Sequence, residues 1–442
     1  MWDRKIIKFT SMLQFKNSGG KNRKQLIALL ATSFIFKLIV FATTGLNSKS
    51  YLSPDSYEYL KLGKNFFKSY IHTNDNFLAL SMLRTPGYPL LISIIGHNRI
   101  WMVIIFQILI SLVISLVVYF MAKNLFGKKI AILALIFSLV DTSLFTETFA
   151  LLTEVLFTLM ITLGVFYLNK YLTRNASIAN LAISSILISF SILVRPIGIL
   201  ILAALAISTI FARGKLLKSL AVIFISTLLV FLGWSMRNYS EGQLFKLSTI
   251  ESNNLLNYEA SGALAISKNI SLDQAQQIES DLLISSLGAS PTIAEISKYQ
   301  ERRAIEIILN NKISIIKLHL IGVAKLMLGP GQGEFIKAIS KGERTSAKNF
   351  LEISLIYFMA LITFISFVFF VIGLARFFNL KTKNDFLWFL VIVFFIFLLG
   401  SSGAQAYARF RVPLNPMISM FAALGLNFTF EKCKLFSKSL GR

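Results

Sequence analysis

Long apolar segments recur along this chain and limit the folds open to it more than any other feature. A helix needs roughly 20 apolar residues to cross a bilayer, and several segments approach that length. Hydrophobic residues make up 55% of the 442 positions, more than a soluble protein of this size could bury. A transmembrane β-barrel would show short alternating segments instead, and the sequence has none. The sequence therefore predicts an all-α, polytopic membrane protein.

About ten transmembrane helices are predicted. They lie near residues 26–46, 100–122, 129–145, 151–169, 178–194, 196–211, 216–236, 350–375, 386–400 and 413–430. The apolar run 86–96 is too short to cross a bilayer alone, so we expect an interfacial helix there, in the first outer loop. A crossing at this run would invert part of the topology. The run 313–329 is interrupted by charged residues and is expected to lie along the membrane surface.

The distribution of charge orients these helices. The segments that this topology places inside hold 22 Lys and Arg residues against three acidic residues, and cytoplasmic loops carry such an excess. Membrane orientation therefore accounts for the net charge of +24. The positive charge is then no argument for nucleic-acid binding. The Ile-, Lys-, Asn- and Phe-rich composition suggests an AT-rich bacterial genome. We therefore expect a bacterial inner (plasma) membrane protein.

This topology divides the chain into five parts. They are a cytoplasmic basic tail (1–25), a transmembrane module (26–236) that includes the outer loop 47–99, an outer loop with helices (237–349), C-terminal transmembrane helices (350–430) and a cytoplasmic tail (431–442). The lone Cys433 excludes a disulfide within these residues, and the three His have no metal-like spacing.

Acidic residues on the outer side are the first candidates for chemistry. Asp55 and Glu58 share a face if their segment is helical, and Ser53-Pro54 before them is typical of a helix start. The alternative role for Asp55 is to stabilise the helix dipole. Glu154 lies at the outer edge of the fourth predicted span, where burying a charge costs roughly 2.5–3.5 kcal/mol; the alternative is a boundary residue that reaches water. Two more acids precede it, Asp141 and Glu147.

Five arginines lie at predicted outer ends of helices, close to a proline or a polar dipeptide. They are Arg84, Arg195, Arg237, Arg409 and Arg411. Guanidinium is the preferred planar clamp for phosphate, so the set indicates an anionic substrate. The alternative for any one of them is a long side chain reaching from a helix end to water. The sequence has no nucleotide-binding loop, HExxH or Gly-x-Ser-x-Gly motif, so a donor in the membrane fits better than a soluble nucleotide.

Six short motifs follow one another along residues 30–425. They are Pro54-Asp55-Ser56-Tyr57-x-Tyr59, Arg84-Thr-Pro-Gly-Tyr-Pro89, Leu152-Thr153-Glu154, Val194-Arg195-Pro196, Trp234-x-x-Arg237-Asn238-Tyr239 and Tyr407-x-Arg409-x-Arg411-x-Pro413. In their order and spacing the chain resembles the membrane glycosyltransferases of the GT-C class. It looks most like the bacterial relatives of protein O-mannosyltransferases and of the aminoarabinose transferase that acts on lipid A.

The resemblance implies a sugar donor on a polyprenyl phosphate and transfer on the outer (periplasmic or extracellular) face. Asp55 matches the catalytic carboxylate of the first loop, and Glu154 matches the second acidic position. Arg84 matches a basic position that meets the donor phosphate, and Arg411, with Arg409, matches a basic pair near the last helix. Many members carry paired acids where this chain has Pro-Asp-Ser, which leaves the role of Glu58 open.

These matches suggest an inverting transfer within the predicted catalytic module. Asp55 would act as general base, and Arg84 and Arg411 would hold the leaving phosphate. Further candidates are Arg409 and Arg237 for the phosphate and Glu58, Tyr57, Tyr88, Asp141, Glu147 and Arg195 for the site as a whole. The expected partners are the lipid-linked donor, membrane lipids and a lipid, glycan or protein acceptor. No cofactor is indicated; a divalent metal is compatible with the class, but the sequence shows no ligand set.

Two other functions fit the same sequence. A lipid-linked oligosaccharide ligase would need a wider cavity. A membrane transporter or flippase of a lipid-linked sugar would commonly show repeated halves and broken helices at mid-membrane, which the sequence does not show. A non-enzymatic assembly protein would not explain an Asp and an Arg on one outer loop.

Overall fold

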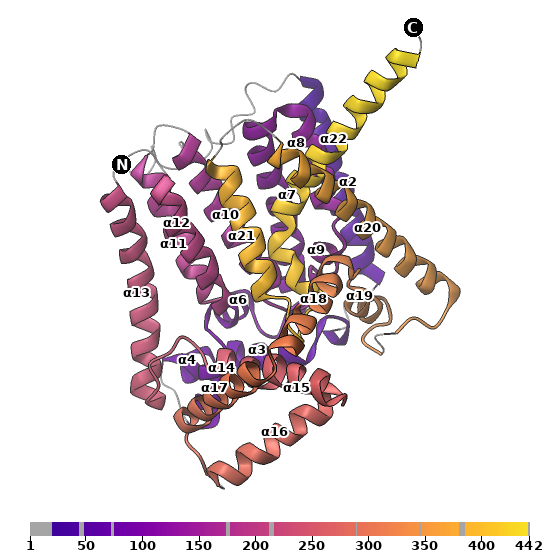
Figure 1. Ribbon diagram of the computed structural model, residues 1–442. Coiled ribbons are helices and arrows are strands. Elements are labelled where there is room, and N and C mark those ends of the chain that lie inside the picture. Colours follow the sequence, from indigo (N-terminus) through magenta and orange to yellow (C-terminus); the bar gives the residue numbers. More distant parts are fainter. Residues whose placement is uncertain are drawn as a thin grey trace.

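The computed structural model describes residues 20–43, 48–71, 75–173, 177–211, 216–288, 290–343, 346–379 and 385–440. Across these residues the regular structure is helical: long helices form a bundle, and a layer of shorter helices lies beneath it in the view of Figure 1. The predicted fold class, an all-α polytopic membrane protein, is confirmed. Residues 1–19 of the predicted basic tail and the last two residues of the predicted C-terminal tail lie outside the described residues.

Each of the ten predicted spans corresponds to a helix. They are α2 (Gly20–Thr43), α7 (Ile100–Phe126), α8 (Lys128–Val140), α10 (Glu154–Thr173), α11 (Ile178–Ile192), α12 (Ile199–Phe211), α13 (Leu216–Gly242), α20 (Phe350–Phe378), α21 (Asp385–Gly400) and α22 (Asn415–Leu440). A bilayer offers no water to satisfy backbone groups, so an apolar run of this length becomes a helix.

Both predicted outer loops are also helical. The first contains α3 (Pro54–Lys64), α4 (Phe66–Tyr70), α5 (Asp75–Leu83) and α6 (Gly87–Ile95). The second contains α14 (Ile250–Asn254), a π-helical turn (Leu255–Ala260), α15 (Ser261–Lys268), α16 (Leu272–Leu287), α17 (Ile293–Asn310), α18 (Lys312–Leu328) and α19 (Gln332–Ile339). As the sequence predicts, Ser53 is the N-cap of α3 and Pro54 opens it.

The number of membrane crossings stays a prediction. Of the helices in the described ranges, five are long and apolar enough to cross, and seven spans result if two bent helix pairs each count as one. These pairs are α5 with α6, bent by 114°, and α17 with α18, bent by 97°. The interfacial position of the 86–96 run therefore also stays a prediction.

One predicted span, 129–145, is shorter in the structure. Helix α8 ends at Val140 because Asp141 begins a separate helix, α9 (Thr142–Glu147). The Asp141 carboxylate accepts a hydrogen bond from the Leu144 N–H at 2.7 Å. The carboxylate thus satisfies one of the N–H groups in the first turn of α9 that have no partner within the helix. The chain therefore starts a new helix at this point, and α8 does not extend further.

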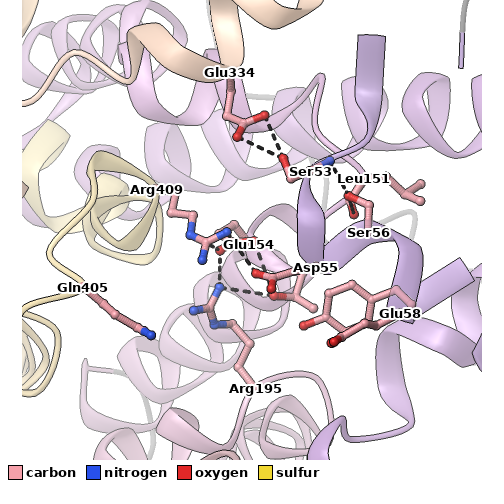
Figure 2. Close-up of polar contacts among 12 residues, drawn as sticks. Ser53, Asp55, Ser56, Glu58, Leu151, Glu154, Arg195, Glu334, Gln405 and Arg409 are labelled. Carbon is pink, nitrogen blue, oxygen red and sulfur yellow. Dashed lines mark hydrogen bonds and ion pairs between the residues drawn. The ribbon is translucent and has the colours of Figure 1, made fainter. Parts of the chain in front are cut away.

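Buried hydrogen bonds attach the first outer loop to the bundle. The Ser56 hydroxyl donates to the Leu151 carbonyl at 2.9 Å, just ahead of α10 (Figure 2). The Tyr88 hydroxyl donates to the Gln107 side chain on α7 at 2.7 Å, and the Gln107 amide donates to the Ala150 carbonyl at 2.8 Å. Since buried polar groups are costly to leave unpaired, these contacts fix α3 and α6 beside the start of α10.

A glycine lets the turn before α6 approach the turn that follows α11. The Gly87 N–H donates to the Leu193 carbonyl at 2.7 Å, and an added Cβ would lie 2.7 Å from the same oxygen. Any larger residue would push the two turns apart. The close contact places Arg84, three residues before Gly87, and Arg195, two residues after Leu193, at the edge of one cavity.

Candidate active site

A cavity of about 550 Å³ opens between the bundle and the layer of shorter helices. Six stretches of chain line it, which fall within residues 55–59, 83–85, 152–154, 194–200, 250–259 and 400–410. Its charged lining residues are Asp55, Glu58, Arg84, Glu154, Arg195, Glu251, Glu259 and Arg409. Most of the motifs singled out in the sequence therefore meet in one place.

The acidic pair of α3 binds the arginine at the end of the same loop. The Arg84 guanidinium donates from Nη2 to Asp55 Oδ1 at 2.8 Å and from Nε to Glu58 Oε2 at 2.6 Å. Arg84 also lies against the Tyr59 ring, 5.2 Å from its centroid. Asp55 and Glu58 thus share one face of α3, and Arg84 crosslinks it.

A second arginine reaches Asp55 from the other end of the chain. Arg409 Nη1 donates to Asp55 Oδ2 at 3.2 Å, and Arg409 Nε lies 3.8 Å from Glu154 Oε1 (Figure 2). Arg195 pairs with the same Glu154 oxygen and donates to the Thr153 hydroxyl at 3.2 Å. Carboxylates and guanidinium groups therefore alternate along the cavity wall from Glu58 to Arg195.

The two arginines determine the ionisation of Asp55. Burial raises the pKa of the Asp55 carboxyl, but the charges and hydrogen bonds of Arg84 and Arg409 together outweigh burial and hold its pKa below the ordinary value. Asp55 is therefore ionised at neutral pH and can accept a proton.

Some guanidinium N–H groups in this cluster make no hydrogen bond to the described residues. The Arg409 Nε atom is buried and makes no hydrogen bond within the described part of the chain. The side-chain hydrogen bonds of Arg195 to described residues run from Nη1 alone. Both residues line the cavity, so an anion bound there could accept hydrogen bonds from both.

Two of the predicted phosphate-binding arginines lie elsewhere. Arg411 is only 3% exposed, and its Nη1 donates to the carbonyls of Leu326 and Met327 at 3.0 and 2.7 Å, at the end of α18. Arg237 donates to the Ser69 carbonyl at 3.0 Å and lies against the Trp234 ring. Neither residue lines the cavity, so the structure does not bring Arg84 and Arg411 together as the sequence suggested.

The remaining predicted candidates also lie outside the cavity lining. Tyr57 is 60% exposed, Tyr88 is buried against Gln107, and Asp141 caps α9. Glu147 ends α9 and is buried; burial, together with the charges of nearby acidic side chains, raises the pKa of its carboxyl well above the ordinary value.

One wall of the cavity was not predicted. It comes from the second outer loop and the segment before the last helix, and it carries Asn253, Asn254, Tyr258, Glu259 and Gln405. In the sequence these residues lie within ordinary polar stretches, so no pattern separates them from a solvated surface. Figure 2 shows the Gln405 side chain extending toward the arginine cluster.

The carboxylates that line the cavity are arranged as ion-pair partners of arginines. A metal site made by protein side chains alone needs several oxygen, nitrogen or sulfur ligands that converge on one point. No group of three or more His, Cys, Asp or Glu side chains converges in this way among the residues that the structure describes. Asp55, Glu58 and Glu154 face guanidinium groups instead, so we assign no step to a metal.

Residues 86–236 match the family model described as dolichyl-phosphate-mannose-protein mannosyltransferase. No protein of curated function matches the sequence. Among solved structures, the archaeal oligosaccharyltransferase AglB from Archaeoglobus fulgidus is 14% identical with a TM-score of 0.50, over 95% of this chain and 52% of that one. ArnT from Cupriavidus metallidurans is 13% identical with a TM-score of 0.40, over 91% and 77%.

This chain thus spans about half the length of the archaeal protein whose fold it shares. The family model begins at Pro86, directly before α6, and ends at Met236 within α13. The chain therefore resembles the GT-C class of membrane glycosyltransferases, as its sequence predicts.

Proposed function

We propose that this protein is a glycosyltransferase that moves a sugar from a polyprenyl-phosphate donor to an acceptor on the outer face of the membrane. The observation that carries the proposal is the ionised Asp55, held between Arg84 and Arg409 in a cavity of about 550 Å³. A carboxylate can accept the proton of an attacking hydroxyl, and guanidinium groups can hold a phosphate. The archaeal structure of similar fold was solved in complex with a dolichol-phosphate.

In this mechanism the acceptor hydroxyl attacks the anomeric carbon from the face opposite the phosphate. Its proton passes to Asp55 as the new carbon–oxygen bond forms. The old bond to the phosphate oxygen breaks, and its electron pair leaves with the polyprenyl phosphate. The anomeric configuration is therefore inverted.

Arg195 and Arg409 are the proposed phosphate clamp, since both line the cavity and both have guanidinium N–H groups that make no hydrogen bond to the described residues. Fixed cations at the departing oxygen stabilise the charge that develops in the transition state. Arg409 also binds Asp55. A phosphate that draws Arg409 away would raise the pKa of Asp55, so donor binding would make Asp55 a better base.

The size of the cavity favours a small glycan on the donor. Ligand pockets of roughly 300–1,000 Å³ enclose molecules of drug size, and this cavity lies near the middle of that range. A donor with one or a few sugars fits such a space better than the large glycan of an oligosaccharide ligase.

The decisive experiment is the Asp55→Asn variant, which keeps the shape of the side chain but cannot accept the proton. Purified protein in lipid nanodiscs is given undecaprenyl-phosphate-linked radiolabelled sugars and candidate acceptors. We expect transfer to fall about a hundredfold or more, as for loss of a general base. The matched control is Glu58→Gln, which alters the other Arg84 partner and should retain most of the rate. Retention of more than about a tenth of the rate in Asp55→Asn would contradict the proposal.

A further inference from the structure

We propose that Glu259 determines which sugar the cavity accepts, by receiving hydrogen bonds from sugar hydroxyl groups. This inference rests on the proposed function. It assigns a role to the wall that the second outer loop contributes, where Glu259 lies with Asn254 and Gln405.

The backbone at Glu259 is unusual. Residues 255–260 form a single π-helical turn between α14 and α15. Such turns are rare and often occur at functional sites, and the extra residue changes the direction of the side chains within the turn. Here the turn lets Glu259 line the cavity, while Leu256 and Ala260 are buried in the packing against α17.

Two neighbouring residues, His319 and Gly403, determine the position of the Glu259 carboxylate. His319 Nε2 on α18 lies 3.4 Å from Glu259 Oε2, and His319 Nδ1 lies 2.8 Å from the hydroxyl of the fully buried Ser402. The other carboxylate oxygen lies over Gly403, where an added Cβ would be 1.6 Å from Oε1. An imidazole on one side and a glycine on the other therefore fix the orientation of the carboxylate.

The contact with Ser402 also orients the imidazole ring. The Ser402 hydroxyl donates its hydrogen to the Leu399 carbonyl at 3.0 Å, so His319 Nδ1 must donate to Ser402. The other ring nitrogen, Nε2, faces Glu259 Oε2. Carboxylate oxygens accept hydrogen bonds, so Glu259 suits the hydroxyl groups of a ligand.

The cavity is accordingly divided by chemistry. Arg195 and Arg409 offer cationic donors to a phosphate, whereas Glu259 and the amides of Asn254 and Gln405 offer hydrogen-bonding groups to hydroxyls. A phosphate-linked sugar has the same division, with its charge at one end and its hydroxyls elsewhere. A site that hydrogen-bonds a particular hydroxyl rejects analogues that lack it or place it differently.

The test compares binding of lipid-linked sugars with binding of the lipid phosphate alone. The full chain in nanodiscs is titrated with undecaprenyl phosphate and with its mannose, glucose and galactose conjugates. In Glu259→Gln we expect the preferred conjugate to bind about tenfold to a hundredfold more weakly. The affinity for undecaprenyl phosphate should not change, and the differences among the three sugars should shrink.

A second variant and a control complete the test. Gly403→Ala keeps the carboxylate but displaces it, so it should change the sugar preference in the same direction. Asp281→Asn removes an exposed carboxylate of the same outer loop and should have no effect. The inference is overturned if Glu259→Gln keeps the wild-type sugar preference, or if it weakens undecaprenyl phosphate equally. If the wild-type protein binds neither the lipid phosphate nor any conjugate, the proposed function fails and this inference fails with it.

Discussion

Asp55 holds two guanidinium groups at once, one from its own loop and one from the segment before the last helix. Arg84 is only 14% exposed and Asp55 31%, so water screens their attraction incompletely. Arg84 in turn also binds Glu58. Arg84 and Arg409 therefore orient the Asp55 carboxylate and keep it ionised. Removing either arginine should shift the pKa of Asp55.

Replacing Arg84 by Gln should shift the pH dependence of transfer. In the native protein the pKa of Asp55 is held below the ordinary value of about 3.9, so the active, ionised form is lost only as pH falls below that value. Removing one cation raises the pKa, and the active form is then lost at a higher pH. A profile of kcat/KM against pH for both proteins measures the position of this acid limb.

The matched control is Arg237→Gln, which removes an arginine that does not line the cavity. Its acid limb should coincide with that of the native protein. An unshifted limb in Arg84→Gln would mean that Asp55 is not the group that titrates.

Residue chemistry made part of this site predictable from the sequence. Asp55, Arg84 and Glu154 stand out because charge near a membrane segment is costly. The separation of Arg409 from Arg411 was not predictable. The two lie in a 3₁₀ helix (Ala408–Leu414), and its three residues per turn point residues i and i+2 to different sides. One guanidinium therefore reaches the cavity, while the other enters the protein interior.

Helices α20 and α22 approach each other through glycines. A Cβ added at Gly373 would lie 1.8 Å from the Phe421 carbonyl, and one at Gly425 would lie 2.0 Å from the Phe369 carbonyl. Small residues allow such close packing of membrane helices, where the hydrophobic effect gives little drive for association. This crossing helps to hold α22 in the bundle, and α22 directly follows the segment that carries Arg409.

Gly373→Leu should therefore destabilise the protein, because the side chain has no room beside the Phe421 backbone. Overpacking commonly costs about 1–3 kcal/mol, and a backbone obstacle leaves little scope for relief. Thermal unfolding in detergent should show a lower Tm. The control is Gly233→Leu on α13, where an added Cβ meets nothing within 4 Å. Equal Tm values for the two variants would contradict this account of the crossing.

At the level of helices, prediction from the sequence works well for the bundle because apolar length determines each helix. It works less well for the layer of shorter helices. Asn254 and Glu259 reach the cavity only because α14, the π-helical turn and α15 pack against α17 and α18. Such contacts join residues far apart in the chain, and no local pattern specifies them.

The molecule as a whole has two unlike sides. In Figure 1 the end of α22 projects on the upper side, and the layer with α16 closes the lower side. The charge distribution predicts that the upper side is cytoplasmic. The lone cysteine, the exposed Cys433 of α22, provides a natural marker for this orientation.

A membrane-impermeant maleimide should therefore label Cys433 only after the cells are permeabilised. In a Cys433→Ser background, Ser285→Cys on the exposed surface of α16 should be labelled in intact cells. The two sites serve as controls for each other, since each reports on one side. The reverse pattern would show that the cavity opens to the cytoplasm.

The π-helical turn at 255–260 also has a consequence for genetics. A deletion of one codon within it would leave an uninterrupted α-helix of nearly the same length. The helices on either side would keep their register, because the π-helical turn accommodates its extra residue locally, but the side chains of the turn itself would point in other directions. Such a chain could still fold and bind its lipid, yet it would present a different set of side chains to the sugar. Related chains that differ by one residue here would therefore be expected to differ in the sugar they carry.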